Sequence, residues 1–143
     1  MKTQNKKLTA FTVNIRVKLA GLWTTLMLLY IYCDIYSTFR TGHLQEVMAG
    51  KIGPFEVNQA TLAFWGALMI PTALMVTVSL FAKAGVVKWG SIIIGILYTF
   101  VNIGNLVSET WVYYWMYGIL ELALTIFIII VAAKWPKEEK TNV

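Results

Sequence analysis

Four long runs of apolar residues limit what this chain can fold into. They cover residues 19–39, 60–82, 89–108 and 111–133. A helix needs about 20 mainly apolar residues to cross a hydrocarbon core of about 30 Å, and each run meets that length. None of the runs shows the alternation of a transmembrane strand, and backbone amides in lipid must bond within their own segment. The sequence therefore predicts an all-α fold, an integral membrane four-helix bundle.

The basic residues predict how this bundle lies in the membrane. Ten of the twelve lysines and arginines flank one side of it, namely Lys2, Lys6, Lys7, Arg16, Lys18, Lys83, Lys88, Lys134, Lys137 and Lys140. Only Arg40 and Lys51 fall on the other side. Because short loops rich in Lys and Arg stay in the cytoplasm, we expect a multi-pass protein of the cell (inner or plasma) membrane with both termini cytoplasmic.

The same pattern divides the chain into three parts. Residues 1–18 form a basic cytoplasmic segment, 19–134 the transmembrane domain and 135–143 a cytoplasmic tail. The first run is too long for the core of a signal peptide and has no small-residue cleavage site at its end, so it is expected to be a retained span. The net charge of +5 is explained by topology and by attraction to anionic lipid at the cytoplasmic face, without any nucleic acid.

The connections between the runs carry turn signals. The longest is the first outer loop, residues 40–59, in which residues 43–49 can form a short interfacial helix before a Gly53-Pro54 turn. A tight inner turn is expected at residues 83–88, around a glycine. Pro71 lies near the middle of the second run and removes one backbone hydrogen bond there.

Each run carries polar or small side chains at helical spacing along one face, so the four faces are expected to meet inside the bundle. Run by run, these residues are Trp23, Met27, Tyr30, Asp34 and Ser37; Asn58, Thr61, Trp65, Thr72 and Ser79; Ser91, Gly95, Tyr98, Asn102, Asn105 and Glu109; and Tyr114, Tyr117, Glu121 and Thr125.

Glu121 is the most costly of these residues, because it lies about 15 Å below Trp111, near the bilayer centre. A carboxylate there costs about 2.5–3.5 kcal/mol even on the mild translocon scale. The four runs contain no Lys or Arg, so protonation, hydrogen bonding to Tyr or Asn, or binding of a cation would have to neutralise or solvate it. We predict an outward-facing ligand pocket floored by Glu121 and lined by Asp34, Asn102, Asn105, Tyr98, Tyr117 and Tyr30.

A second interpretation stays open, because polar residues also hold membrane helices together through hydrogen bonds of about 0.6–2 kcal/mol. This interpretation is the favoured one for Asn102, Asn105 and Thr72. For Asp34, which lies nearer to water, helix packing or hydration at the interface is favoured, and for Glu121 the two interpretations are equally supported. It describes a structural or accessory protein that forms a homo-oligomer or assists a partner and transports nothing.

The chain lacks the residues that several kinds of membrane chemistry need. The chain has one histidine and one cysteine, Cys33, so two-histidine haem ligation, paired-cysteine redox chemistry and His/Cys metal clusters are excluded. There is no P-loop for ATP hydrolysis and no nucleophile–base pair. We therefore expect no cofactor and no bound metal, and a membrane enzyme that acts on a lipid substrate is the least supported interpretation.

Short motifs along the chain resemble a family of small bacterial four-span proteins recorded only as a domain of unknown function. They are Tyr32 and Asp34 at the end of the first run, Met69-Ile70-Pro71 followed by Met75-Val76 and Ser79 in the second, and Tyr117 with Glu121 in the fourth. The chain departs from the family in its plainer turn at residues 83–88. It is also similar in size and topology to DoxX-like proteins. The resemblance implies the four-span topology and brings no activity.

Taken together, these patterns predict a small transporter or binding protein for a cation or small polar ligand. Its cation could contact the faces of the tyrosine rings as well as the carboxylates.

Overall fold

The computed structural model describes residues 12–107 and 109–136 of the chain and contains four long helices. Each is long and apolar enough to cross a membrane, which confirms the predicted all-α, four-helix architecture. They are α1 (Ile15–Thr38), α3 (Gln59–Phe81), α4 (Ala84–Leu106) and α5 (Val112–Ala133).

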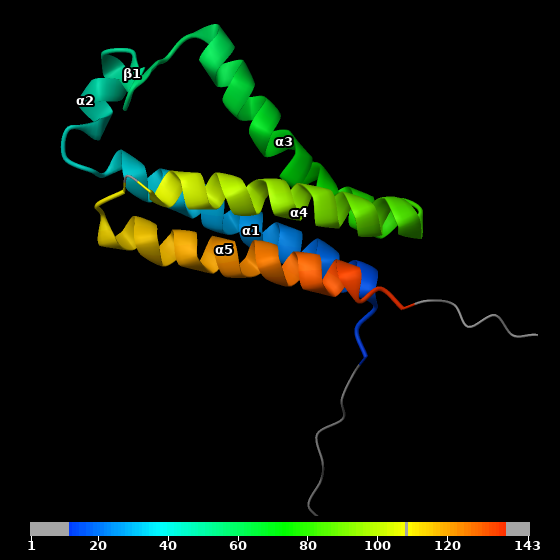
Figure 1. Ribbon diagram of the computed structural model, residues 1–143. Helices are drawn as coiled ribbons and strands as arrows, with labels where there is room; N and C mark the ends of the chain where they lie inside the picture. Colours follow the sequence, from blue (N-terminus) through cyan, green and yellow to red (C-terminus); the bar gives the residue numbers. More distant parts are fainter. Residues whose placement is uncertain (1–11, 108, 137–143) are drawn as a thin grey trace, which may run out of the picture.

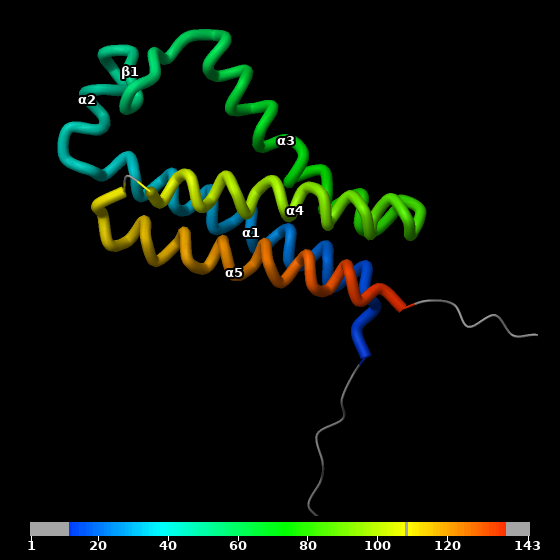
Figure 2. The backbone as a smooth tube through the Cα atoms, in the orientation of Figure 1, coloured from blue at the N-terminus to red at the C-terminus, as the bar shows by residue number. Residues whose placement is uncertain are grey.

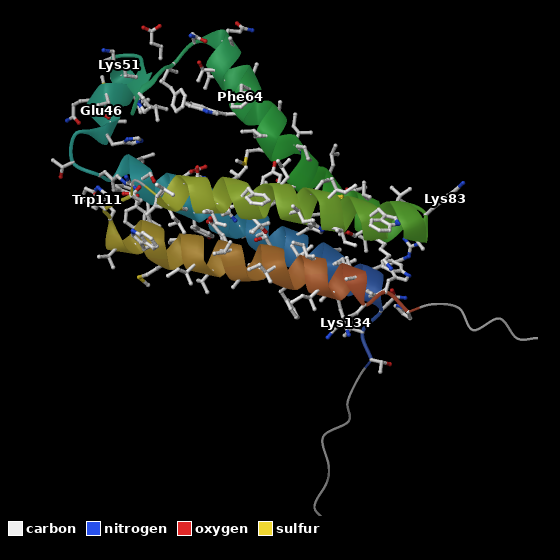
Figure 3. All side chains as sticks on the ribbon, viewed as in Figure 1. Glu46, Lys51, Phe64, Lys83, Trp111 and Lys134 are labelled. Carbon is white, nitrogen blue, oxygen red and sulfur yellow. The ribbon has the colours of Figure 1, made fainter. Side chains whose placement is uncertain are left out.

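The long helices form an antiparallel bundle. α5 packs against both α4 and α1, and α3 packs against both α1 and α4. Figure 1 shows α1, α4 and α5 running alongside one another, whereas the N-terminal half of α3 diverges from them. The backbone tube makes the same divergence plain (Figure 2). Lys83 and Lys134 lie at one end of the bundle and Lys51 at the other, which we call the basic end and the loop end (Figure 3).

Side-chain caps mark where two of the helices begin. The Asn14 side chain accepts a hydrogen bond from the backbone N–H of Arg16 at 2.9 Å, at the start of α1. Asn58 caps α3 by accepting from the backbone N–H of Thr61 at 3.0 Å. Such caps satisfy N–H groups that have no partner within a helix. α1 therefore begins at Ile15, four residues before the apolar run itself.

The predicted inner turn at residues 83–88 is wrong. α3 ends at Phe81 and α4 begins at Ala84, so only Ala82 and Lys83 connect them. Lys88 and its neighbours lie in the first turns of α4. A lysine is tolerated near a helix end because it can lay its aliphatic stem along apolar surface and keep its charge in water. The connection between α4 and α5 is correspondingly longer than predicted and runs from Val107 to Trp111.

The loop between α1 and α3 contains small elements of its own. The expected short helix is present as α2 (His43–Met48), and a two-stranded hairpin that the sequence did not predict follows it. Its strands are β1 (Lys51–Ile52) and β2 (Phe55–Glu56), with Lys51 opposite Glu56 and Ile52 opposite Phe55. Gly53 opens the turn with φ +54°, a conformation that hairpin turns require and that glycine adopts without steric cost.

The hydrophobic core lies in the half of the bundle next to the basic end. Its buried members are Leu19, Trp23, Leu26, Met75, Val87, Ile128 and Ala132. Arg16 closes this end by donating hydrogen bonds to the backbone carbonyls of Ser79 (3.3 Å) and Ala82 (2.5 Å) at the end of α3. Its guanidinium also lies 5.7 Å from the centre of the Trp135 ring. The basic half is therefore packed around this core, and Arg16 ties the start of α1 to the end of α3.

Candidate functional site

A small cavity lies on the loop-end side of this core. Its volume is about 60 Å³, which is room for a few waters or one small cation. Six of the seven residues predicted to form a pocket line it, namely Tyr30, Asp34, Tyr98, Asn102, Asn105 and Glu121. Cys33, Met69, Val101 and Tyr114 complete the lining. The convergence of polar faces from α1, α4 and α5 therefore brings these side chains to one place.

Tyr117 is the one predicted pocket residue that does not line the cavity. It is half-buried, and its ring lies 6.1 Å from that of Tyr36, on the outside of the α1–α5 contact. The buried face of α5 runs through Gly118, Glu121 and Thr125, so it is rotated slightly from the face that the tyrosine spacing suggested. Tyr114 enters the cavity lining instead.

Glu121 lies near the middle of α5 and is 7% exposed. Its Oε1 atom is buried and has no hydrogen-bond partner within residues 12–107 and 109–136. Buried polar groups in proteins are nearly always paired, and one that is left unpaired costs roughly 1–3 kcal/mol. An unpaired acceptor at a cavity therefore points to a missing donor or cation.

Two further polar atoms at the cavity lack a partner in the described part of the chain, one a hydroxyl that can donate or accept and one an amide nitrogen that only donates. The Tyr98 hydroxyl and the Asn102 Nδ2 are buried without a partner among the described residues, and their side chains are only 1% and 2% exposed. The Asn102 Oδ1 is used, because it accepts a hydrogen bond from the Tyr30 hydroxyl at 3.1 Å. This bond links α1 to α4 across the bundle and holds the amide in place beside the cavity.

The cavity is acidic and open on one side. Glu121 and Asp34 both line it, and no Lys or Arg does. Asp34 and Asn105 are themselves exposed, so the cavity reaches the surface of the bundle. Two carboxylates at one small site repel each other when both are ionised, and a proton or a bound cation removes that repulsion.

Other polar residues of the predicted faces bond to each other away from the cavity. The Trp23 Nε1 donates to the Ser91 Oγ at 3.4 Å, and the Thr99 Oγ1 donates to the Thr125 Oγ1 at 3.1 Å. The Thr72 Oγ1 bonds to the Met69 carbonyl of its own helix at 2.7 Å. The first two contacts join helices, as the packing interpretation expects for this part of the faces.

An arginine cluster above the cavity was not predicted. The Arg40 Nη2 lies 2.8 Å from the Glu109 Oε2, and the Arg40 Nε donates to the Tyr113 hydroxyl. The same guanidinium lies 5.1–5.5 Å from the ring centres of Trp111, Tyr113 and Tyr114. Local periodicity cannot reveal this cluster, because its members are about 70 residues apart in the chain. The one signal in the sequence was that position 40 carries an arginine and not a lysine. Arginine suits bidentate pairing with a carboxylate and stacking on aromatic rings.

The ionisation of Glu109 is set by this cluster. Burial of the Glu109 side chain opposes its ionisation, but hydrogen bonds from Arg40 and from two backbone N–H groups outweigh burial and lower the pKa of Glu109 below its usual value. Those N–H groups belong to Thr110 and Trp111, at 2.8 and 3.0 Å. Arg40 is therefore already paired and is not a counter-charge for the acids of the cavity.

This site combines two carboxylates with phenol hydroxyls and amides and has no basic side chain in its lining. Within the described residues, no group of three His, Cys, Asp or Glu side chains could hold a metal ion together. The single cysteine, Cys33, is buried and has no histidine beside it in the cavity lining. The arrangement can accept a proton or surround a small cation with carboxylate and phenol oxygens.

The fold and the site together define a small multi-pass membrane protein with a polar interior. Residues 6–142 match the family described as "Family of unknown function (DUF6326)". Because the match covers nearly the whole chain, the protein belongs to that family, as its short motifs indicated. Neither the curated proteins nor the solved structures include a match.

Proposed function

We propose that this protein binds a small cation, or a small polar ligand that carries one, at the Glu121 cavity, and that it acts as a small transporter or binding protein of the cell membrane. The observation that carries the proposal is the buried Glu121 Oε1, which lacks a partner in the described part of the chain and faces a cavity with a second acid. A cation would satisfy this oxygen and also offset the repulsion between Glu121 and Asp34.

The proposed orientation puts the cavity on the side facing away from the cytoplasm. Arg16, Lys18, Lys83, Lys88 and Lys134 flank the basic end of the bundle, and the positive-inside rule assigns such an end to the cytoplasm. The hydrophobic core lies in that half, whereas the cavity lies toward the loop end. The ligand would then enter from outside.

Anionic lipid is the proposed partner at the cytoplasmic face. Lys18 and Lys134 line a groove between the start of α1 and the end of α5, where they can attract acidic head groups.

Cation-dependent thermal stability of the purified protein in detergent tests the proposed function. The probes are Na⁺, K⁺ and methylammonium chloride at constant ionic strength. A cation that binds only the folded protein stabilises it by about 2.7 kcal/mol at 100 times its Kd, so one of the three should raise the unfolding midpoint. Glu121→Gln should abolish that rise, and Glu46→Gln, an exposed acid on α2, should retain it.

Proton release distinguishes the two ways of neutralising Glu121. If the cation replaces a proton, adding it to weakly buffered wild-type protein acidifies the solution, and Glu121→Gln removes this change. An absence of any Glu121-dependent response to all three cations, in both measurements, contradicts the proposed function.

The structural alternative is favoured by one observation, the set of polar bonds within the bundle, including that between Thr99 and Thr125. If the protein only scaffolds or oligomerises, Glu121→Gln changes its unfolding midpoint or its oligomeric state, and no cation distinguishes the variant from the wild type.

A further inference from the structure

The N-terminal half of α3 stands apart from the rest of the bundle. The buried residues of α3 are Thr72, Met75 and Ser79, all of which follow Pro71. No residue from Gln59 to Pro71 is buried. Figures 1 and 2 show this half of the helix leaving α4 and rising towards the α2 loop. On the loop-end side of the bundle, α3 therefore does not cover α1 and α4.

The face of this half that turns towards the bundle is identifiable from burial. Thr61, Trp65 and Leu68 are half-buried, and they follow one another at helical spacing down to the buried Thr72. Phe64, labelled on the same stretch in Figure 3, is 62% exposed. Trp65 packs edge-on against Phe55, with ring centres 6.0 Å apart. We call the uncovered flank of the bundle beside this half of α3 the opening. The half-buried face of α3 that borders it is mainly apolar and leads down to the buried Thr72.

The acidic cavity lies at the foot of this opening. Its lining includes Met69 from α3 and Val101 and Asn105 from α4. Met69 and Asn105 are exposed, so the cavity reaches the surface of the bundle between these two helices. The helices are of membrane-spanning length, so the opening faces the bilayer sideways. A ligand dissolved in the lipid can reach the acids without crossing the Arg40 cluster at the loop end.

Size then restricts the ligand. A cavity of about 60 Å³ holds an ammonium group or a few waters but no larger organic body. Any remainder of the ligand must lie outside the cavity, in the opening beyond Met69, where Leu68 and Trp65 belong to the half-buried face of α3. A remainder in that position is surrounded by apolar side chains and lipid, so it must be apolar itself.

The unpaired atoms restrict the head group. An ammonium has three N–H donors and no acceptor, and the cavity offers acceptor oxygens from Glu121, Asp34 and the Tyr98 hydroxyl. The Asn102 Nδ2 is itself a donor, so it can pair only with an acceptor such as a carboxylate oxygen and not with the ammonium. The rings of Tyr30 and Tyr98, whose centres are 6.3 Å apart, add faces that attract a cation. A quaternary ammonium has no N–H to donate and is too large for the cavity.

We infer that the protein binds amphipathic primary amines, with the ammonium group at Glu121 and the apolar tail in the opening between the N-terminal half of α3 and α4. This inference rests on the proposed function and specifies its ligand class and its route of entry.

Calorimetric titration of the protein in lipid nanodiscs tests the inference. The probes are methylammonium, octylammonium and octyltrimethylammonium, and titrations into nanodiscs without protein are subtracted to remove partitioning into the lipid. Octylammonium should bind more tightly than methylammonium, and octyltrimethylammonium should not bind. Glu121→Gln should weaken octylammonium binding by about tenfold or more. If Glu121→Gln fails to fold, Asp34→Asn, a change at an exposed position, is titrated in its place and should also weaken octylammonium binding.

A matched pair of variants on α3 isolates the tail. Trp65→Ala should weaken octylammonium binding about fivefold and leave methylammonium binding unchanged. Phe64→Ala removes a neighbouring aromatic ring on the exposed side and should change neither. If methylammonium binds through Glu121 but the tail adds nothing, or if Trp65→Ala and Phe64→Ala behave alike, the inference is overturned and the proposed function stands. If no amine binds in a Glu121-dependent way, the inference is overturned, and the proposed function then depends on the responses to Na⁺ and K⁺.

Discussion

At the scale of single residues, Arg40 does most to fix the loop end of the bundle. It follows α1 directly, and its guanidinium pairs with Glu109 in the α4–α5 connection and stacks on rings at the start of α5. Both side chains are partly buried, with 18% of Arg40 and 12% of Glu109 exposed, so water competes with their contact less than it does with a surface pair. Bonds of this kind contribute more than an exposed ion pair does.

Breaking this pair should destabilise the protein. We expect Arg40→Gln to lower the free energy of unfolding in detergent by about 1–2 kcal/mol. Lys51→Gln, which removes an exposed positive charge from the same end, serves as the matched control and should have little effect. Equal effects of the two substitutions would show that general charge at the loop end matters and the pairing does not.

The pH dependence of the same contact has a definite sign. The pKa of Glu109 in the folded protein is lowered relative to an unfolded value of about 4.3. The stabilisation is therefore fully present above about pH 4.3 and is lost as the pH falls through the folded-state pKa. The difference in unfolding free energy between the wild type and Glu109→Gln should be constant near neutral pH and shrink in acid. A difference that grows on acidification would contradict this assignment.

At the scale of elements, the α4–α5 hairpin depends on two glycines at its interface. A Cβ placed on Gly95 would lie 2.8 Å from the Ile129 Cγ1, and one on Gly118 would lie 2.6 Å from the Leu106 Cδ2. Both distances are well inside van der Waals contact. Small residues let membrane helices approach closely, and the packing gained in this way holds the helices together.

Adding a methyl group at either glycine should therefore push α4 and α5 apart. We expect Gly95→Ala and Gly118→Ala each to lower the free energy of unfolding by about 1–3 kcal/mol, the usual cost of overfilling a packed site. Gly104→Ala is the control on α4, because nothing lies within 4 Å of its added Cβ. Unfolding in detergent followed by circular dichroism measures all three. A loss in the control equal to that at Gly95 would place the cause in helix conformation and not in packing.

The elements also show how far local sequence reaches. Length and hydropathy predicted the four helices because a membrane span is set by a single local quantity, the number of successive apolar residues. The start of α4 at Ala84 was missed because Gly85 and Lys88 are typical of turns, although both are tolerated in the first turns of a helix. The inward face of α4, with Ser91, Tyr98 and Asn102 buried, followed correctly from helical spacing.

The candidate site was predictable only as a set of residues. Spacing placed Glu121, Tyr98 and Asn102 on inward faces, and the structure brings them to one cavity. Spacing could not reveal that Tyr117 does not line the cavity, since a small rotation of α5 decides between it and Gly118. It also could not reveal the opening beside α3, because that opening depends on which half of the helix finds a partner.

At the scale of the whole molecule, the two halves of the bundle differ in packing. The basic half holds the hydrophobic core and the Arg16 contacts to the end of α3, whereas the loop half holds the cavity and the divergent part of α3. A site in the loop half is therefore open on that side, and the hydrophobic core lies between it and the basic end. Which side of the membrane the loop half occupies decides where a ligand comes from.

Cysteine labelling in intact cells tests the proposed orientation. The protein has a single cysteine, so Cys33→Ala gives a background in which one new thiol can be followed. In this background, the cysteine of Lys51→Cys, in the β1–β2 hairpin, should react with a membrane-impermeant maleimide added to intact cells. The cysteine of Lys83→Cys, between α3 and α4, should react only after the membrane is permeabilised. Lys134→Cys should behave in the same way, because both positions lie at the basic end (Figure 3). The reverse labelling pattern would place the cavity on the cytoplasmic side, because a rigid bundle of four spans keeps its two ends on opposite faces of the bilayer. Ligand entry from outside would then be wrong, even if the Glu121 site binds a cation.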